Sequence, residues 1–151
     1  MKRIYVDTSV FGGVFDSEFE KPSQEFFDQV ETKIFALVTS AVVREEIEFA
    51  PQRVKNFFNR MLPDAEIVNI TKEALKLRQA YLNADIVTAK YGNDALHVAL
   101  ATISNCEIIV SWNFRHIVHS EKIPLYNAVN ILQGYNQIQI FSPLEVIKYE
   151  S

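Results

Sequence analysis

The sequence lacks several features that would place it in common protein classes. It contains one cysteine, Cys106, in 151 residues, so no internal disulfide is expected, and it has no Cys/His spacing typical of a zinc site. No apolar run approaches the roughly 18 residues of a membrane span, and no signal peptide precedes the first apolar run. We therefore expect a cytoplasmic protein that does not span a membrane.

Glycine is also scarce, with 4 residues against 11 Phe and 6 Tyr, which excludes a low-complexity or disordered chain. Apolar residues make up 48% of the sequence, enough for one domain with a sizeable core. The net charge of −4 excludes nucleic-acid binding through bulk charge alone. If the protein acts on nucleic acid, a local basic rim or a bound cation must overcome that charge.

Short apolar runs alternate with amphipathic segments along the whole chain. Strands are expected at residues 3–7, 34–38, 66–70, 108–110 and 138–141, and helices at about 23–30, 40–47, 51–61, 71–82, 93–104, 125–132 and from 142 onward. The Gly12-Gly13 pair is expected in a turn. This alternation predicts a three-layer α/β/α domain over residues 1–151, with a central, mostly parallel sheet and a helical arm at about 41–62.

Asp7 directly follows the first predicted strand, Ile4-Tyr5-Val6. A carboxylate in this place lies at the carboxyl end of a buried strand, which is the edge where ligands gather in open α/β sheets. An aspartate after a strand can instead cap a turn, which is a purely structural role. Taken alone, Asp7 leaves both interpretations open.

Three further polar positions follow the same logic as Asp7. Glu46, with Glu45 beside it, lies in the helix after the second predicted strand. Asp94 lies in the first turn of the most apolar helix, and Asn113 follows the strand at 108–110. In a parallel sheet these positions share the carboxyl edge, so their side chains can converge. The structural alternative for Asp94 is stabilisation of the helix dipole.

Acids that meet at one edge repel each other unless a cation neutralises their charge. Oxygen ligands without cysteine or paired histidine suit Mg²⁺ or Mn²⁺ rather than zinc. Such a cation lowers the pKa of a bound water and stabilises charge on a phosphoryl oxygen. The pattern of acids therefore predicts a Mg²⁺ or Mn²⁺ site.

Four short motifs carry a resemblance to a known family. They are Asp7-Thr8-Ser9-Val10, TSAVVREEI at 39–47, NDALHVA at 93–99 and IVSWNF at 109–114. Their order, and their places on the predicted elements, are more specific than any one of them. Over residues 1–145 the chain resembles PIN-domain ribonucleases, and among these the VapC-like toxins.

The resemblance implies a Mg²⁺- or Mn²⁺-dependent endoribonuclease that cleaves RNA, and the toxin of a toxin–antitoxin pair. It carries the family's metal-binding acids over to Asp7, Glu46 and Asp94. Glu46 is favoured over Glu45 because the family's acid usually precedes an aliphatic residue, here Ile47. The resemblance also implies three partners: an RNA substrate, an antitoxin and a second copy of the chain.

Asn113 departs from the family, which often has a further aspartate at this position. An amide oxygen can still ligate a metal or hold a water, so Asn113 stays in the predicted catalytic set. Because the amide brings no negative charge, the site is expected to hold one metal tightly rather than two, and the nuclease to be slower or absent. The alternative function is a catalytically weak or inactive PIN-like module that binds RNA or protein.

The remaining polar residues have open roles. The hydroxyls of Ser9 and Ser111 can position a water or a phosphate oxygen, or simply bond within turns. His97 is expected to be a buried, hydrogen-bonded histidine without a catalytic role. Two basic groups can meet RNA phosphates or remain solvated: Arg115, His116, His119 and Lys122 after the Asn113 loop, and Arg44, Arg53, Lys55 and Arg60 on the arm.

Overall fold

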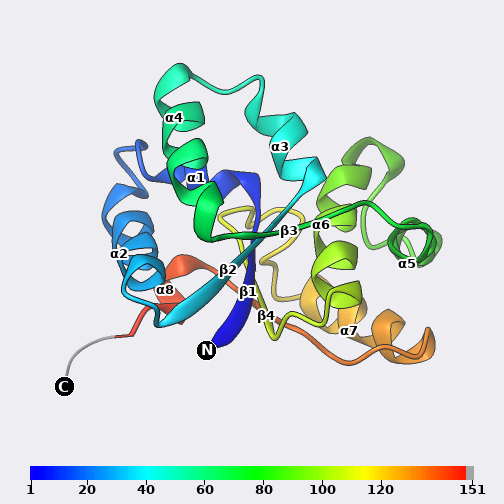
Figure 1. Ribbon diagram of the computed structural model, residues 1–151. Coiled ribbons are helices and arrows are strands. Elements are labelled where there is room, and N and C mark those ends of the chain that lie inside the picture. Colours follow the sequence, from blue (N-terminus) through cyan, green and yellow to red (C-terminus); the bar gives the residue numbers. More distant parts are fainter. Residues whose placement is uncertain (149–151) are drawn as a thin grey trace.

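Five parallel strands form the centre of the computed structural model, which describes residues 1–148 (Figure 1). Their order across the sheet is β3-β2-β1-β4-β5, and every neighbouring pair is parallel. The bounds are β1 Lys2–Val6, β2 Phe35–Ser40, β3 Glu66–Val68, β4 Ile108–Val110 and β5 Gln139–Phe141. The predicted three-layer α/β/α fold is confirmed, and the sheet is parallel throughout.

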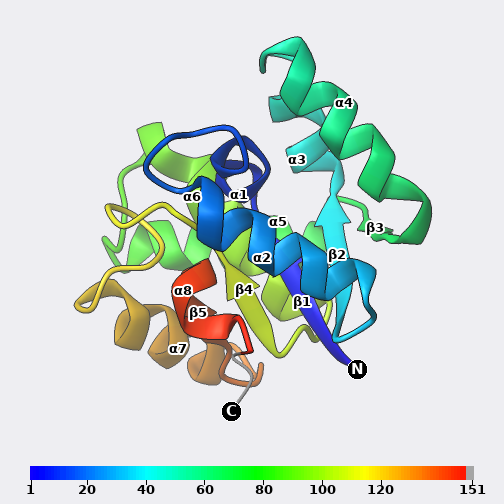
Figure 2. The same ribbon diagram turned by 90° about the vertical axis from the view of Figure 1, so that its left-hand side faces the viewer.

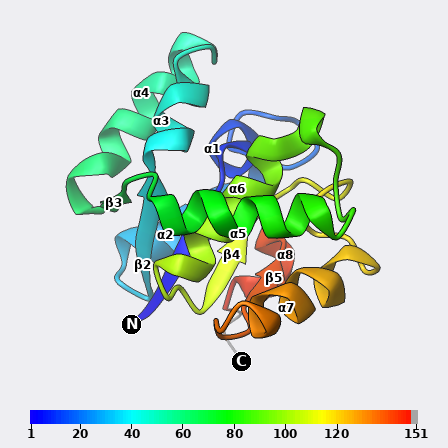
Figure 3. The same cartoon turned by 90° about the vertical axis from the view of Figure 1, so that its right-hand side faces the viewer.

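Helices cover both faces of this sheet. One face carries α2 (Glu20–Glu31) and α8 (Pro143–Val146), as Figure 2 shows, and the other carries α5 (Lys72–Asn83), α6 (Gly92–Ile103) and α7 (Lys122–Leu132), as Figure 3 shows. Near the carboxyl ends of the strands lie α1 (Thr8–Gly13), α3 (Ala41–Ile47) and α4 (Gln52–Met61). Two short 3-10 helices, η1 (Leu62–Asp64) and η2 (Ala89–Tyr91), complete the elements.

The central strand β1 shows why the sheet is buried on both sides. Tyr5 belongs to the apolar cluster under α5, α6 and α7, whereas Ile4 and Val6 belong to the cluster under α1, α2 and α4. All three side chains are fully buried. Successive strand residues point to opposite faces, so a strand covered on both faces has a continuous apolar sequence rather than an alternating one.

The segment after β1 differs from the prediction. Residues 8–13 form helix α1, so the expected turn at Gly12-Gly13 is wrong. Gly13 ends this helix where the chain packs closely: a Cβ there would lie 2.6 Å from the Ser23 hydroxyl and 2.8 Å from Nε1 of Trp112. Ser23 itself is buried inside α2, which begins at Glu20, and accepts a hydrogen bond from the Trp112 indole.

Polar residues cap the start of three other helices. Ser40 caps α3 by accepting the Val43 N–H, and Thr71 caps α5 in the same way. The capping box from Ser142 to Glu145 is present at α8. Helix α7, however, begins at Lys122, three residues before the predicted start at Leu125.

The helical segment after β2 packs back onto the domain rather than standing free. Phe57 of α4 lies against Phe11 of α1 and Phe27 of α2, with ring centroids 6.4 and 4.8 Å apart. Phe58 and Met61 are buried. This packing fixes α3, which carries Glu46, over the carboxyl edge of the sheet. None of the helices within residues 1–148 is long and apolar enough to cross a membrane.

Candidate active site

The order of the strands creates a switch point beside β1. The chain passes from β1 to β2 and β3 on one side, then crosses to β4 and β5 on the other. In open parallel sheets, ligands bind outside the carboxyl ends of the strands at such a point. Asp7 follows β1 here and Ser111 follows β4, and the two side chains are hydrogen-bonded to each other.

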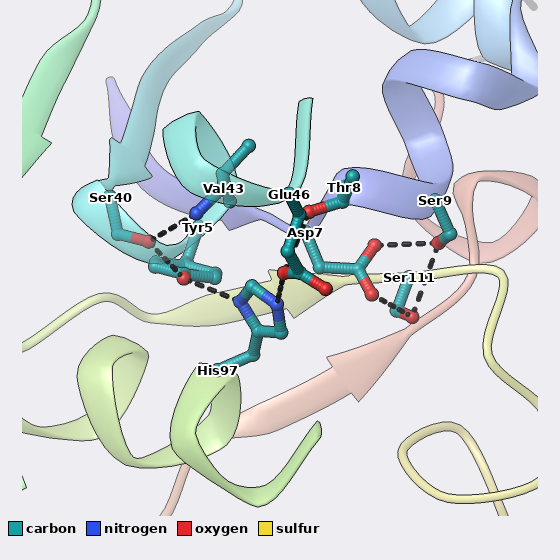
Figure 4. Close-up of polar contacts among 9 residues, drawn as sticks. All are labelled: Tyr5, Asp7, Thr8, Ser9, Ser40, Val43, Glu46, His97 and Ser111. Atoms are coloured by element: carbon teal, nitrogen blue, oxygen red, sulfur yellow. Dashed lines mark hydrogen bonds and ion pairs between the residues drawn. The ribbon is translucent and has the colours of Figure 1, made fainter. Parts of the chain in front are cut away.

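Asp7 is held in a fixed orientation by two hydroxyls (Figure 4). Ser9 donates to Oδ1 at 2.6 Å, and Ser111 donates to Oδ2 at 2.7 Å. These serines accept in turn from the backbone N–H groups of Trp112 and Asn113. Burial raises the pKa of Asp7, against the opposing effects of His97 and the two hydroxyls. The serines therefore bind the carboxylate, rather than only stabilising local turns.

Glu46, on helix α3, lies near Asp7 and contacts residues of α1 and α6. Its Oε1 accepts a hydrogen bond from Thr8 Oγ1 at 3.0 Å, and it lies 2.6 Å from Nε2 of His97. Although burial acts to raise the pKa of Glu46, the hydrogen bond from His97 lowers it overall. The neighbouring Glu45 is exposed to solvent. The structure thus brings Glu46, and not Glu45, to the carboxyl edge.

Behind Glu46, a buried chain of polar groups crosses from β2 to α6. Nδ1 of His97 lies 2.7 Å from the Tyr5 hydroxyl, which lies 2.7 Å from Oγ of Ser40. Figure 4 shows this row of contacts. Burial raises the pKa of Tyr5 well above its usual range, so the phenol keeps its proton. In a neutral His97, Tyr5 donates to Nδ1; in a charged His97, Nδ1 donates to Tyr5.

The proton on Nε2 of His97 faces Glu46 in both cases. Burial disfavours the charged ring, but the hydrogen bond to Glu46 and the charge of Asp7 raise the pKa of His97 overall. His97 is therefore a fully buried, fully bonded histidine, as the sequence predicted. Its position beside Glu46 shows that it also orients a candidate site residue.

Asp94 and Asn113 lie on the other side of the edge. Burial raises the pKa of Asp94, while His116 and a hydrogen bond with Asn113 act to lower it. The amide oxygen of Asn113 accepts from the backbone N–H groups of Arg115 and His116, at 3.2 and 2.9 Å. Its oxygen thus shapes the loop after β4, and its amide interacts with Asp94.

Glu46 affects the ionisation of the other two acids, which bears on metal binding. The charge of Glu46 acts to raise the pKa of both Asp7 and Asp94. Carboxylates that share an edge in this way are the donors that a hard divalent cation prefers, and a cation would remove their repulsion. Within residues 1–148, no three His, Cys, Asp or Glu side chains are close enough to bind one ion together. The donor chemistry fits a divalent cation, while the side chains are not closed around one.

Two of the site's supporting residues were missed from the sequence. Tyr5 was taken only as part of an apolar strand, although a buried phenol needs a hydrogen-bond partner. Thr8, adjacent to Asp7, was not assigned a role. Nothing in the sequence pairs Tyr5 or Thr8 with a particular partner, because those partners, His97 and Glu46, come from distant segments.

The two predicted basic groups have different surroundings. On the arm, Arg53 and Arg60 lie over the rings of Phe15 and Phe57, and Arg60 also pairs with Glu31. The group after Asn113 lies next to the candidate site. There Arg115 lies over the ring of Tyr91, and the Lys122 ammonium donates to the Ile86 carbonyl at 2.7 Å. His119 accepts the N–H of Glu121.

Comparison with known families shows to which family the chain belongs. The profile described as PIN domain matches residues 4–117. The chain belongs to the PIN domain family. The match runs from within β1 to beyond β4 and includes all four residues of the predicted catalytic set. PIN domains are generally nucleases, and nucleases of this family generally use divalent metals.

Solved structures give the same fold at low sequence identity. The chain is similar to VapBC2 from Rickettsia felis bound to a fragment of promoter DNA, with a TM-score of 0.60 and 11% identity over 93% of this chain and 98% of that chain. It is also similar to FitAcB from Neisseria gonorrhoeae, with a TM-score of 0.62 and 13% identity over 95% of this chain and 99% of that chain. No curated protein matches the sequence.

Proposed function

We propose that this PIN-domain protein is a Mg²⁺- or Mn²⁺-dependent endoribonuclease. The observation that supports the proposal is the pair of Asp7 and Glu46 at the carboxyl edge beside the switch point, with Asp94 close enough that the charge of Glu46 opposes ionisation of both aspartates. A divalent cation in this place would supply a water of low pKa and stabilise charge on the phosphate. Asp7, Glu46 and Asp94 are the residues that would hold it.

The protein's own groups have distinct parts in this proposal. Ser9 and Ser111 fix the orientation of the buried Asp7 carboxylate. His97 fixes the orientation of Glu46 from the opposite side. Both carboxylates are thus oriented before substrate binds. Preorganised groups of this kind need no reorganisation during the reaction. We assign Asn113 a positioning role through Asp94, because its amide oxygen is already used by the backbone of its loop.

RNA cleavage by the purified full chain tests the enzyme. A mixture of labelled single-stranded RNAs, incubated with Mn²⁺ and separately with EDTA, should be cut only with the metal. Asp7→Asn and Asp94→Asn should each lower the initial rate by roughly 100-fold or more, since even residues that only support metal ligands contribute 10- to 100-fold. Glu45→Gln, which removes an exposed carboxylate of the same helix, is the matched control and should cut like wild type.

The outcomes separate the enzyme from a binding module. Metal-dependent cleavage that survives in both aspartate variants would show that a contaminating nuclease or another site is responsible. Intact RNA in all samples, together with measurable RNA binding, would instead identify the inactive PIN-like module. Wild-type folding of each variant is checked by circular dichroism before rates are compared.

We also propose that the protein acts as the toxin of a toxin–antitoxin pair, as a homodimer held by an antitoxin. The support is its shared fold with VapBC2 and FitAcB, and with a toxin–antitoxin complex from Klebsiella pneumoniae at a TM-score of 0.59 and 14% identity, over 79% of this chain and 93% of that chain. Induced expression in bacteria should arrest growth, and Asp7→Asn should relieve the arrest. Growth arrest that is unchanged in Asp7→Asn would contradict a nuclease toxin. Light scattering of the purified protein reports the mass of the dimer.

A further inference from the structure

Two loops that flank the candidate active site meet beside Asp94. One runs from the end of α5 through η2 to the start of α6, and the other follows Asn113 (Figures 2 and 3). The ring of Tyr91 from the first loop stacks on the ring of His116 from the second, with centroids 3.9 Å apart. The bond from Lys122 to the Ile86 carbonyl joins the same two loops. These two contacts hold the loops together in a defined conformation next to the acids.

Three cations surround this stacked pair. Lys90 and Arg115 each lie 5.6 Å from the centre of the Tyr91 ring, and Lys122 lines the same cavity as Tyr91. Within residues 1–148, none of these three forms an ion pair with a carboxylate. In a chain of net charge −4, this is a local concentration of positive charge next to a cluster of acids. An anionic ligand bound next to the acids would therefore have these three positive side chains beside it.

A cavity of about 200 Å³ lies between the loops, lined by Thr88, Tyr91, His116 and Lys122 together with Asp85. The His116 side chain is only 9% exposed, and neither of its ring nitrogens has a hydrogen-bond partner in the described part of the chain. Buried polar groups are nearly always bonded in folded proteins. A ligand that offers both a donor and an acceptor would provide what His116 lacks.

We propose that this cavity is a nucleotide-binding subsite that holds one unpaired base of a single-stranded RNA. This proposal rests on the proposed function, because the base in the cavity would belong to the nucleotide next to the phosphate that is cleaved at Asp7, Glu46 and Asp94. The base packs against the pair of Tyr91 and His116, and Arg115 and Lys90 bind the adjoining phosphates. We name this set, Lys90, Tyr91, Arg115 and His116 with its cavity, the base pocket.

The chemistry of the base pocket favours RNA over other ligands. Its volume is below the roughly 300–1,000 Å³ of pockets that enclose drug-sized molecules, so it suits one flat ring system. Bases that are not paired can leave the strand and stack on aromatic or histidine side chains, which is how single-stranded RNA is recognised. The carboxylate of Asp85 and the hydroxyl of Thr88 line the same cavity and can bond to base edges.

Fluorescence anisotropy with a labelled single-stranded RNA in EDTA tests the base pocket without cleavage. Tyr91→Leu should weaken binding by roughly tenfold, as expected for the loss of one stacked base. Tyr91→Phe keeps the ring and should bind like wild type. Arg115→Gln should weaken binding and reduce the salt dependence by the amount for one phosphate contact, about 0.7 in the slope of log K against log salt.

The controls distinguish the base pocket from general attraction of charge. Lys76→Gln removes an exposed cation on α5 and should leave affinity unchanged. A duplex RNA of the same length should bind more weakly, because its bases are not available. Wild-type affinity in Tyr91→Leu, an equal loss in Lys76→Gln and Arg115→Gln, or no binding of wild type would each overturn the proposal. Arg115 is exposed, so its variant should fold even if Tyr91→Leu does not.

These results are independent of those for the nuclease. Cleavage with Mn²⁺ that depends on Asp7, combined with wild-type RNA affinity in Tyr91→Leu, refutes the base pocket and leaves the proposed function standing. Loss of affinity in Tyr91→Leu, with no cleavage under any condition, supports the base pocket and refutes the nuclease.

Discussion

The hydroxyl of Tyr5 lies 2.7 Å from Nδ1 of His97, and the other nitrogen of this ring lies 2.6 Å from Glu46. A residue in the middle of the central strand is thus connected to a candidate metal ligand on another layer. Because Tyr5 and His97 are both fully buried, neither can exchange its partner for water. The contact between Tyr5 and His97 therefore contributes both to the stability of the fold and to the orientation of Glu46.

Tyr5→Phe should therefore destabilise the protein. The substitution keeps the ring but leaves Nδ1 of His97 buried without its partner, which costs about 1–3 kcal/mol. Urea unfolding at neutral pH measures the change. Tyr135→Phe is the matched control, because no hydrogen bond to the Tyr135 hydroxyl is found among residues 1–148; its effect should stay within about 0.5 kcal/mol. Equal effects of the two substitutions would show that the contact with His97 contributes nothing.

Asp7→Asn should stabilise the metal-free protein while it removes activity. Since burial raises the pKa of Asp7, the folded state binds the proton more tightly than the unfolded chain. The stability linked to this group is complete below about pH 4 and is lost as the pH rises through the folded pKa. An asparagine does not ionise, so the variant should gain on the order of 1 kcal/mol near neutral pH and little in acid.

Urea unfolding in EDTA, at about pH 4.5 and about pH 7.5, tests this dependence. Asp64→Asn changes an exposed carboxylate and should show no comparable gain. A destabilised Asp7→Asn at neutral pH would mean that the bonds from Ser9 and Ser111 outweigh the burial of charge.

The adjacent acids Glu45 and Glu46 offer a matched test of the metal site. Glu46→Gln and Glu45→Gln remove the same charge from neighbouring positions of α3, but only Glu46 contacts Thr8 and His97. In calorimetric titration with Mn²⁺, Glu46→Gln should weaken binding by roughly 10- to 100-fold or more, whereas Glu45→Gln should bind like wild type. Equal weakening would indicate an effect of net charge rather than ligation.

The sequence predicts the layers of this fold well because they depend on local patterns. The apolar runs predicted at residues 3–7 and 108–110 correspond to β1 and β4, and the helix predicted at 71–82 corresponds to α5. The error at Gly12-Gly13 has another origin: whether a glycine pair forms a turn or ends a helix depends on contacts with distant residues. Here those contacts come from Ser23 and Trp112.

The candidate site divides in the same way. That Asp7 and Asp94 share the carboxyl edge was predicted from the parallel character of the sheet, because parallel strands end on one side. The choice between Glu45 and Glu46 rested on resemblance, and the structure adds the contact with His97. The stacking of Tyr91 on His116 could not be foreseen, since it joins two loops whose conformations depend on each other.

Gly13 is the residue where a single methyl group should have the largest effect on the support of the site. A Cβ at this position would lie 2.6 Å from Ser23 Oγ and 2.8 Å from Trp112 Nε1, and these two atoms are hydrogen-bonded to each other. Gly13→Ala must separate them, so a loss of about 1–3 kcal/mol in the free energy of unfolding is expected. Trp112 donates its backbone N–H to Ser9, so Asp7 should also be less well oriented.

Gly12→Ala is the control for Gly13→Ala. Gly12 lies in the same helix, and a Cβ there would meet no atom within 4 Å. Alanine restricts the unfolded chain and favours the helix, so this variant should be unchanged or more stable by up to about 1 kcal/mol. Thermal and urea unfolding of the two variants give the comparison. If Gly13→Ala is as stable as Gly12→Ala, then α1 can move away from α2 freely, and the close packing of Gly13 does not hold Asp7 in place.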